Sequence, residues 1–191
     1  MNDIDDDEKA RKGREYQAFL VALGMAIVGW QYVETTVFVL YARLIRSQNP
    51  VAMSAMYHSI VNLQARLAMV DAAMKATLML KERKALLAEW GRLLRRIKKA
   101  SGRRNDFVHF ELFDGKTIGS DKPSEPLLHS SVFDVREEKV REYTRKDIEE
   151  ITTGFFALKS DLDVFQEKLR KVVPRPSIRK SRASKNRELF E

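Results

Sequence analysis

Residues with the means to do chemistry gather in the segment 103–109, which reads RRNDFVH. Arg104 and His109 are separated by four residues there, and Asn105 directly follows the arginine. A histidine transfers protons near neutral pH because its unperturbed pKa is about 6.5. An arginine can hold a phosphate through two hydrogen bonds and stabilise its negative charge, and an asparagine can orient either group. Together these side chains suit cleavage of a phosphodiester in RNA.

The segment lies at the end of a predicted helix whose apolar stripe consists of Leu86, Trp90, Leu93, Ile97 and Ala100. The next position of that stripe is Arg104, so a cation stands where the core-facing side should continue. On a helix, Asn105 lies about 100° and His109 about 140° around the axis from Arg104, so all three project into one broad sector. Burying an unpaired charge is costly. We therefore expect Arg104 to snorkel, to pair with an acid, or to face a cleft or a subunit interface.

Three more residues are expected to support this site. Glu34 lies at the edge of the apolar face of the first predicted helix, and it is the acid that we expect beside Arg104. Arg103 and Asp106 flank the central pair in the sequence. Three histidines without any cysteine make a poor ligand set, so no metal is predicted. No glycine-rich phosphate loop or serine nucleophile elbow is present, and no cofactor is predicted.

Spacing alone leaves a plainer alternative open. An exposed arginine and a hydrogen-bonded histidine near a helix end would produce the same pattern, which also arises by chance. The cations before the segment, Arg95-Arg96 and Lys98-Lys99, are open to two interpretations in the same way. They can follow an RNA backbone, or they can form an ordinary solvated helix face.

The composition fits one globular domain. The chain has 191 residues, with 35 Lys and Arg against 27 Asp and Glu and a net charge of +8. That length can bury a core without covalent staples. The absence of cysteine excludes a disulfide scaffold and a thiolate nucleophile. The positive charge favours an anionic partner without naming one.

Apolar residues recur at alternating three- and four-residue steps in four segments, which predicts four long amphipathic helices. The first has its stripe within 23–44 and should end near Ser47, because Asn49 suits an N-cap and Pro50 the first position of the next helix. The second helix follows without interruption. The break before the third is placed in the charged stretch Lys81–Lys84.

The third helix runs towards His109, and the last one covers 148–172. The last helix should begin at an N-cap formed by Thr144, with Asp147 three residues later in a capping-box arrangement. We expect the helices to pack as an antiparallel bundle, because each has a single apolar stripe.

Turn-forming residues between these two helices predict a loop or β insertion over about 110–143. In it, residues 111–113 could pair with 131–133, and 139–143 could add an edge strand. Few apolar residues follow Val172, so 173–191 is predicted to be a basic, disordered tail. The expected fold is therefore all-α: an antiparallel four- to five-helix bundle over 1–172, carrying a small loop or β insertion.

The N-terminal region shows an apolar run but no targeting signal. Residues 3–8 are acidic, whereas a secretory signal begins with basic residues. The run Ala18–Trp30 has 13 residues, and a membrane span needs about 20. A buried helix is the preferred interpretation, with a cytoplasmic protein and no stable membrane insertion. Membrane association through this helix or the basic tail is the alternative.

The chain resembles the HEPN superfamily of all-α domains. The resemblance rests on Arg104-Asn105 followed by His109, because the family pattern is an arginine, a polar residue and then a histidine after four to six positions. The motif is also similarly placed, late in a long helix and before a final helix. The resemblance covers roughly residues 17–172. The resemblance implies a metal-independent endoribonuclease in which the ribose 2′-hydroxyl attacks the adjacent phosphate. Arg104 would stabilise the phosphorane, His109 would act as general base or acid, and Asn105 would position the substrate.

The same resemblance implies partners and a biological role. RNA would be the substrate, and two protomers would form a homodimer that brings their motifs into one cleft. The family includes toxins and anti-phage defence effectors, so an antitoxin or another defence-system protein is a possible partner. Some members are inactive. The alternative is therefore a non-catalytic HEPN-like helical dimer that binds RNA, a nucleotide or a partner protein.

Overall fold

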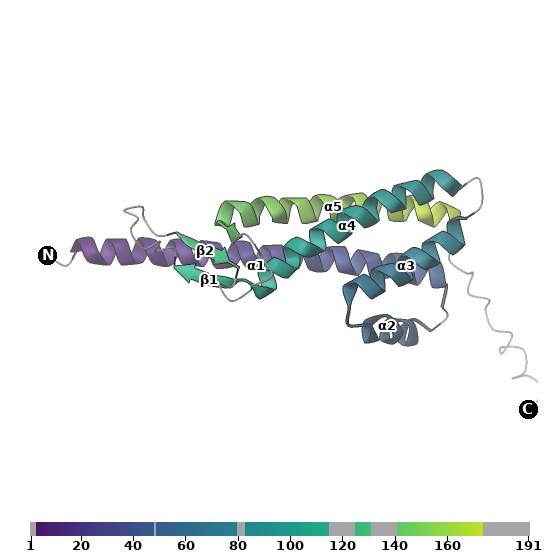
Figure 1. The fold of residues 1–191 in the computed structure, drawn as a ribbon, viewed down its shortest axis with the longest axis horizontal. Helices are drawn as coiled ribbons and strands as arrows, with labels where there is room; N and C mark the ends of the chain where they lie inside the picture. Colours follow the sequence, from purple (N-terminus) through teal and green to yellow (C-terminus); the bar gives the residue numbers. More distant parts are fainter. Residues whose placement is uncertain (1–2, 48, 80–82, 115–124, 131–140, 174–191) are drawn as a thin grey trace, which may run out of the picture.

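The computed structural model describes residues 3–47, 49–79, 83–114, 125–130 and 141–173 (Figure 1). These residues are mostly helical, so the predicted all-α class is confirmed. The helices are α1 (Asp3–Ile45), α2 (Pro50–Ser59), α3 (Leu63–Leu78), α4 (Lys84–His109) and α5 (Arg145–Val172). Three short strands, β1 (Glu111–Asp114), β2 (Pro126–His129) and β3 (Glu142–Tyr143), lie between α4 and α5.

Helices α1 and α5 lie side by side and run in the same direction (Figure 1). Trp30 of α1 contacts Phe155 of α5, and Tyr32 contacts Phe156. Helix α4 is antiparallel to both α3 and α5. The purely antiparallel bundle predicted above therefore differs from the structure in the α1–α5 and α1–α3 pairs, which are parallel. The reason is that α2 carries the chain back before α3, which leaves α1, α3 and α5 running one way and α4 the other.

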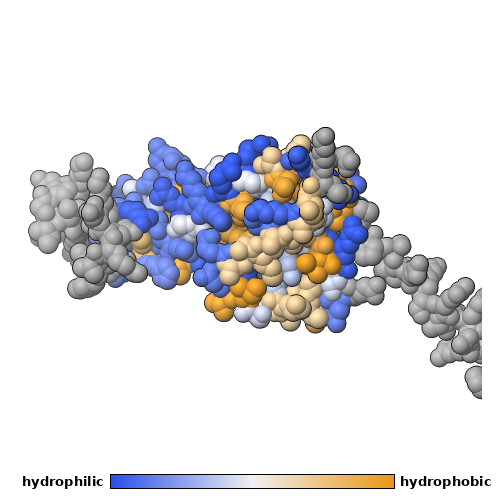
Figure 2. Space-filling view, turned by 45° about the vertical axis from the view of Figure 1, so that its right-hand side comes forward, coloured by the Kyte–Doolittle hydropathy of each residue, from blue (hydrophilic) through white to orange (hydrophobic). Residues whose placement is uncertain are grey.

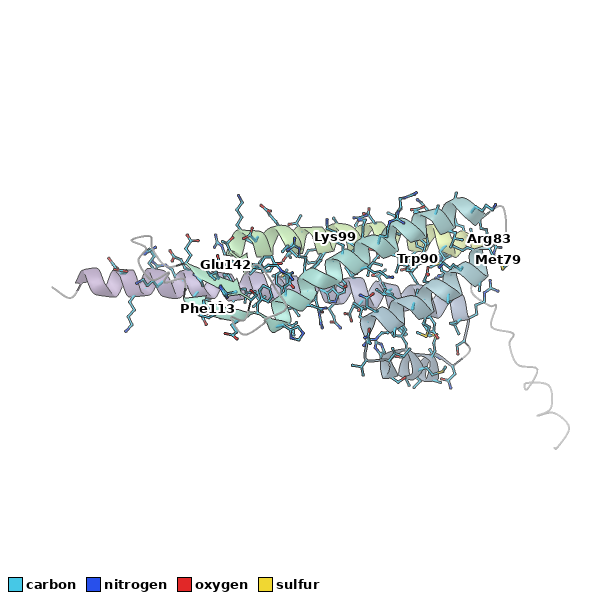
Figure 3. The ribbon with its side chains drawn as sticks, viewed as in Figure 1. Met79, Arg83, Trp90, Lys99, Phe113 and Glu142 are labelled. Atoms are coloured by element: carbon cyan, nitrogen blue, oxygen red, sulfur yellow. The ribbon has the colours of Figure 1, made fainter. Side chains whose placement is uncertain are left out.

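Large aromatic side chains fill the core between these helices. The Trp30 ring lies 5.4 Å from that of Phe155, and the Trp90 ring lies 5.9 Å from that of Phe165. All four residues are at most 2% exposed. Trp90 lies within the bundle (Figure 3), where its indole N–H donates to Asp71 at 2.9 Å. Burying each such side chain contributes roughly 2–3 kcal/mol, so this core fixes the position of α4.

Two predicted helix starts are confirmed in atomic detail. The side chain of Asn49 accepts a hydrogen bond from the backbone N–H of Ala52 at 2.9 Å, and Pro50 follows it. Thr144 and Asp147 form the complete capping box at the start of α5. The break placed in Lys81–Lys84 also agrees with the described residues, because α3 ends at Leu78 and α4 begins at Lys84.

The prediction of a continuous second helix is wrong, because residues 60–62 form a turn that separates α2 from α3. Asn62 caps α3 by accepting from the backbone N–H groups of Gln64 and Ala65. Arg66 satisfies the freed carbonyls, donating to Ile60 at 2.6 Å and to Val61 at 3.3 Å. The apolar stripe continues in phase across this turn, which is why periodicity did not reveal it.

The insertion contains a three-stranded antiparallel sheet in the order β1-β2-β3. Leu112 pairs with Leu128, and Leu128 pairs with Tyr143 on its other side. The partner of β1 is thus 126–129 rather than the predicted 131–133, and residues 131–140 lie outside the described part of the chain. The edge strand predicted over 139–143 is confirmed at Glu142–Tyr143. Of the predicted tail, only Val173 is described.

The run Ala18–Trp30 is buried on one side only, so the prediction of a buried helix is half right. Phe19, Ala22 and Ala26 are buried, whereas other large apolar residues of the run are exposed. Within the described residues, α1 is long and apolar enough to cross a membrane over Asp7–Ile45, with 33% of its most apolar window buried. Apolar side chains also gather along the lower edge of the molecule, where α2 lies (Figure 2).

Candidate functional site

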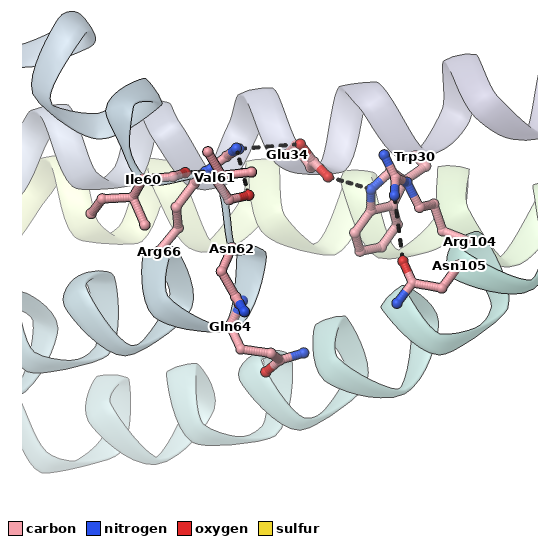
Figure 4. Close-up of polar contacts among 9 residues, drawn as sticks. All are labelled: Trp30, Glu34, Ile60, Val61, Asn62, Gln64, Arg66, Arg104 and Asn105. Carbon is pink, nitrogen blue, oxygen red and sulfur yellow. Dashed lines mark hydrogen bonds and ion pairs between the residues drawn. The ribbon is translucent and has the colours of Figure 1, made fainter. Parts of the chain in front are cut away.

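Arg104 lies on α4 and reaches towards α1, where Trp30 and Glu34 lie (Figure 4). Its side chain is partly buried and donates to the Asn105 side-chain oxygen at 3.4 Å. Among the described residues, no carboxylate lies within ion-pair distance of its guanidinium group. A half-buried guanidinium without an acid can bind an external anion, because planar oxyanions match its donors.

The predicted pairing of Glu34 with Arg104 is wrong. Glu34 accepts a hydrogen bond from the indole N–H of Trp30 at 2.5 Å and forms an ion pair with Arg66 at 3.6 Å (Figure 4). The Glu34 and Arg66 side chains are only 20% and 16% exposed. The helical periodicity correctly placed Glu34 on a face of α1 that contacts another helix, but it did not identify the cation that pairs with it. That cation comes from α3, where Arg66 is already fixed by the turn between α2 and α3.

His109 is the last residue of α4, and its side chain is exposed. Within the described parts of the chain it forms no hydrogen bond, ion pair or ring contact. It lies about 140° around the helix from Arg104. The structure thus joins Arg104 to Asn105 by a hydrogen bond, and among the described residues it shows no bond from His109 to either of them. On the helix surface His109 is the neighbour of Asn105, four residues away.

Arg103 and Asp106 belong to a polar network that ties the end of α4 to β3. The buried Asp106 carboxylate accepts from the Tyr143 hydroxyl at 2.6 Å and from Arg141 at 3.0 Å. Arg103 donates to the same hydroxyl at 2.5 Å and lies over the Tyr143 ring. Burial, together with the hydrogen bond to Asp106, raises the pKa of Tyr143. Both predicted supporting residues therefore hold the helix end against the sheet.

Sequence reasoning missed Arg66, Arg141 and Tyr143. Asn62 could have revealed Arg66. An asparagine favours an N-cap and so marks a helix start, and the side chain four residues later lies over that first turn. No signal marked the other two, because they belong to the insertion and reach α4 only through the pairing of β2 with β3. In Figure 3, Phe113 and Glu142 mark this sheet, at the opposite end of α4 from Arg83.

The basic run of α4 is exposed in the structure. Arg95, Lys98 and Lys99 face solvent, whereas Arg96 pairs with Asp161 of α5 at 2.6 Å. Arg95 and Lys98 share one stripe of the helix with Asn105 and His109, at steps of three, seven and four residues. This stripe could track a polyanion from the middle of α4 to its end.

Among the described residues, no group of three or more His, Asp or Glu side chains could hold a metal ion. Comparison with protein-family models, with curated proteins and with solved structures gives no match. The geometry of Arg104, Asn105 and His109 is therefore the basis on which a function can be argued.

Proposed function

We propose that this chain is a metal-independent endoribonuclease, a helical bundle of the HEPN type in which Arg104, Asn105 and His109 act on RNA. One observation carries the proposal: Arg104 is half-buried beside Asn105 and has no carboxylate partner among the described residues. Keeping a cation in that position costs stability. A bound phosphate offsets that cost and gives the arginine its role.

The proposed reaction is an in-line displacement at phosphorus. The ribose 2′-oxygen attacks the adjacent phosphate, the bond from phosphorus to the 5′-oxygen breaks, and the products end in a 2′,3′-cyclic phosphate and a 5′-hydroxyl. His109 takes the proton from the 2′-hydroxyl or supplies one to the leaving 5′-oxygen. Arg104 stabilises the negative charge that develops on the phosphorane, and Asn105 holds the substrate.

A homodimer would complete this site, because among the described residues no hydrogen bond joins His109 to Arg104. The relevant faces of both helices are partly apolar: Val108 lies four residues from Arg104 and is 52% exposed, and Ile27 lies seven residues before Glu34 and is 47% exposed. These exposed apolar side chains are compatible with a protein interface, and the homodimer itself rests on the resemblance to the HEPN superfamily. The role proposed is that of a cytoplasmic toxin or anti-phage effector, with an antitoxin or another defence-system protein as a further partner.

A non-catalytic HEPN-like dimer that binds RNA, a nucleotide or a partner protein is the alternative. It is favoured by the solvent-exposed His109, which has no orienting hydrogen bond in the described structure. General bases are usually oriented by a neighbour, so an unsupported histidine fits binding at least as well as proton transfer.

Incubation of the purified protein with total RNA in EDTA tests the proposal. The parent and Lys84→Ala, which removes an exposed cation at the other end of the same helix, should degrade the RNA. Arg104→Ala and His109→Ala should lose at least a hundredfold in rate. Equal cleavage by all four proteins would overturn the assignment of the site. RNA binding without cleavage by the parent would favour the non-catalytic alternative.

A further inference from the structure

One side of α1 is apolar, uncharged and exposed. Positions 16–33 contain no Asp, Glu, Lys or Arg, yet only one side of this stretch is buried against the bundle. The large apolar residues on the other side are between 43% and 60% exposed: Tyr16, Leu20, Val21, Met25, Ile27, Val28 and Tyr32. By helix phase they form two arcs of the exposed side: Tyr16, Leu20 and Ile27 on one, and Val21, Met25, Val28 and Tyr32 on the other. Exposed apolar side chains that cluster in this way often mark a binding site.

Four of these residues form a seam beside α5. Val21, Met25, Val28 and Tyr32 follow one another at steps of four, three and four residues. This is the spacing at which the a and d positions of one helix receive the side chains of another. The ring of Tyr32 lies 6.3 Å from that of Phe156, so α5 continues the apolar surface.

A groove of about 670 Å³ separates this part of α1 from the first turns of α5. The two helices are in close contact at its far end, where a Cβ on Gly29 would lie 3.5 Å from Phe155 and Phe156. The apolar residues that line it are Ala18, Val21, Ala22, Met25 and Phe156. An open apolar groove between two parallel helices matches the shape of a third helix.

The charge at one end of the groove specifies the partner further. Arg14 and Arg145 line this end. Glu149 is the one acid among the described lining residues. It forms an ion pair with Arg145 at 3.5 Å, and both of these side chains are more than half exposed. Arg14 has no ion pair or hydrogen bond within the described structure. Carboxylates are therefore the complementary groups.

We propose that this groove binds an amphipathic helix of a partner protein. The helix would have apolar residues at heptad spacing, and its carboxylates would lie at the end that meets Arg14 and Arg145. The groove is separate from the candidate site: Met25 lies about 200° around α1 from Ile27, which shares the face of Glu34. The proposal does not depend on ribonuclease activity.

Two labelled 21-residue peptides test it with the full chain. Both have leucine at positions a and d and alanine or glutamine elsewhere, but one ends in three glutamates and the other in three lysines. We expect the acidic peptide to bind with saturation in fluorescence anisotropy and the basic one to bind at least tenfold more weakly. Met25→Glu should weaken binding of the acidic peptide at least tenfold. Arg14→Glu with Arg145→Glu should reverse the preference.

Met56→Glu is the matched control, because it places the same charge on α2 at a residue that is 65% exposed and outside the groove. Circular dichroism checks that each variant is folded. Equal weakening by Met56→Glu, or no saturable binding of the acidic peptide, would overturn the proposal. So would flotation with phosphatidylcholine–phosphatidylserine vesicles that Met25→Glu abolishes, which would assign the surface to a membrane. A Met25-dependent dimer in light scattering would assign it to a second copy.

Discussion

Arg104 is the residue at which function and stability are expected to conflict. Glu34 is the acid nearest in helix phase, but Trp30 and Arg66 already use both of its oxygens. Among the described residues, the guanidinium group of Arg104 is left with one long hydrogen bond, to Asn105. Under the proposed function, Arg104 is retained at the expense of stability.

Arg104→Met should therefore stabilise the protein while removing activity. Methionine replaces the aliphatic stem of the arginine and removes the partly desolvated charge, so we expect the free energy of unfolding to rise by about 0.5–1 kcal/mol. Urea denaturation measures the change, with Arg95→Met as the exposed control. A loss of more than about 1 kcal/mol would mean that Arg104 holds the fold together.

Tyr57 provides a prediction about alkaline pH. Burial raises the pKa of its hydroxyl to about 12, and the Tyr57 oxygen has no hydrogen-bond partner in the described structure. The unfolded chain loses this proton near pH 10 and the folded chain only near pH 12, so stability is lost as the pH rises between these values. Tyr57→Phe should reduce that loss. At pH 7 it should change stability by less than about 1 kcal/mol, because no hydrogen bond is removed. A larger loss at pH 7 would show that the hydroxyl has a partner.

At the scale of the helices, the start of α5 positions both the groove and the sheet. Thr144→Ala removes the cap, and we expect it to cost about 1 kcal/mol of stability. Hydrogen bonds from Thr144 lower the pKa of Asp147 below 3.8 in the folded chain. This contribution is present above that pH and is lost as the pH falls through the folded value. The difference between parent and variant should therefore shrink below about pH 4. An unchanged difference would show that Asp147 plays no part in it.

Helix ends that depend on local side chains could be predicted, whereas the contacts between helices could not. Asn49, Thr144 and Asp147 act within three residues of their targets, so their pattern is visible in the sequence. The turn at 60–62 escaped prediction because neither Pro nor Gly marks it. The partner of Glu34 escaped because a helical period defines a face but not which of two neighbouring helices supplies the cation.

For the whole molecule, the contacts around the candidate site were likewise only partly predictable from the sequence. Arg104, Asn105 and His109 were found from their spacing, and the structure places the first two together. The support for the helix end comes from Arg141 and Tyr143, which the sheet brings to α4 from more than thirty positions away. His109 has no hydrogen-bond partner among the described residues, and helical spacing alone could not show this.

Mixing two inactive variants tests whether the site is shared between protomers. If Arg104 of one chain acts with His109 of another, Arg104→Ala mixed equally with His109→Ala should recover roughly a quarter of the parent rate. Half of the dimers would be mixed, and each would contain one intact site out of two. Cleavage of RNA by the exchanged mixture, beside each variant alone, measures this. No recovery after confirmed subunit exchange would contradict a shared site.

The most direct test of the proposed chemistry is the identity of the new RNA ends. A short RNA of defined sequence is incubated with the protein in EDTA, and the fragments are analysed by mass spectrometry beside a His109→Ala reaction. Attack by the 2′-hydroxyl predicts fragments that end in 2′,3′-cyclic phosphate and 5′-hydroxyl groups, and these should be missing with the variant. Fragments with 3′-hydroxyl and 5′-phosphate ends, or cyclic phosphates formed equally by the variant, would contradict the proposed role of Arg104 and His109.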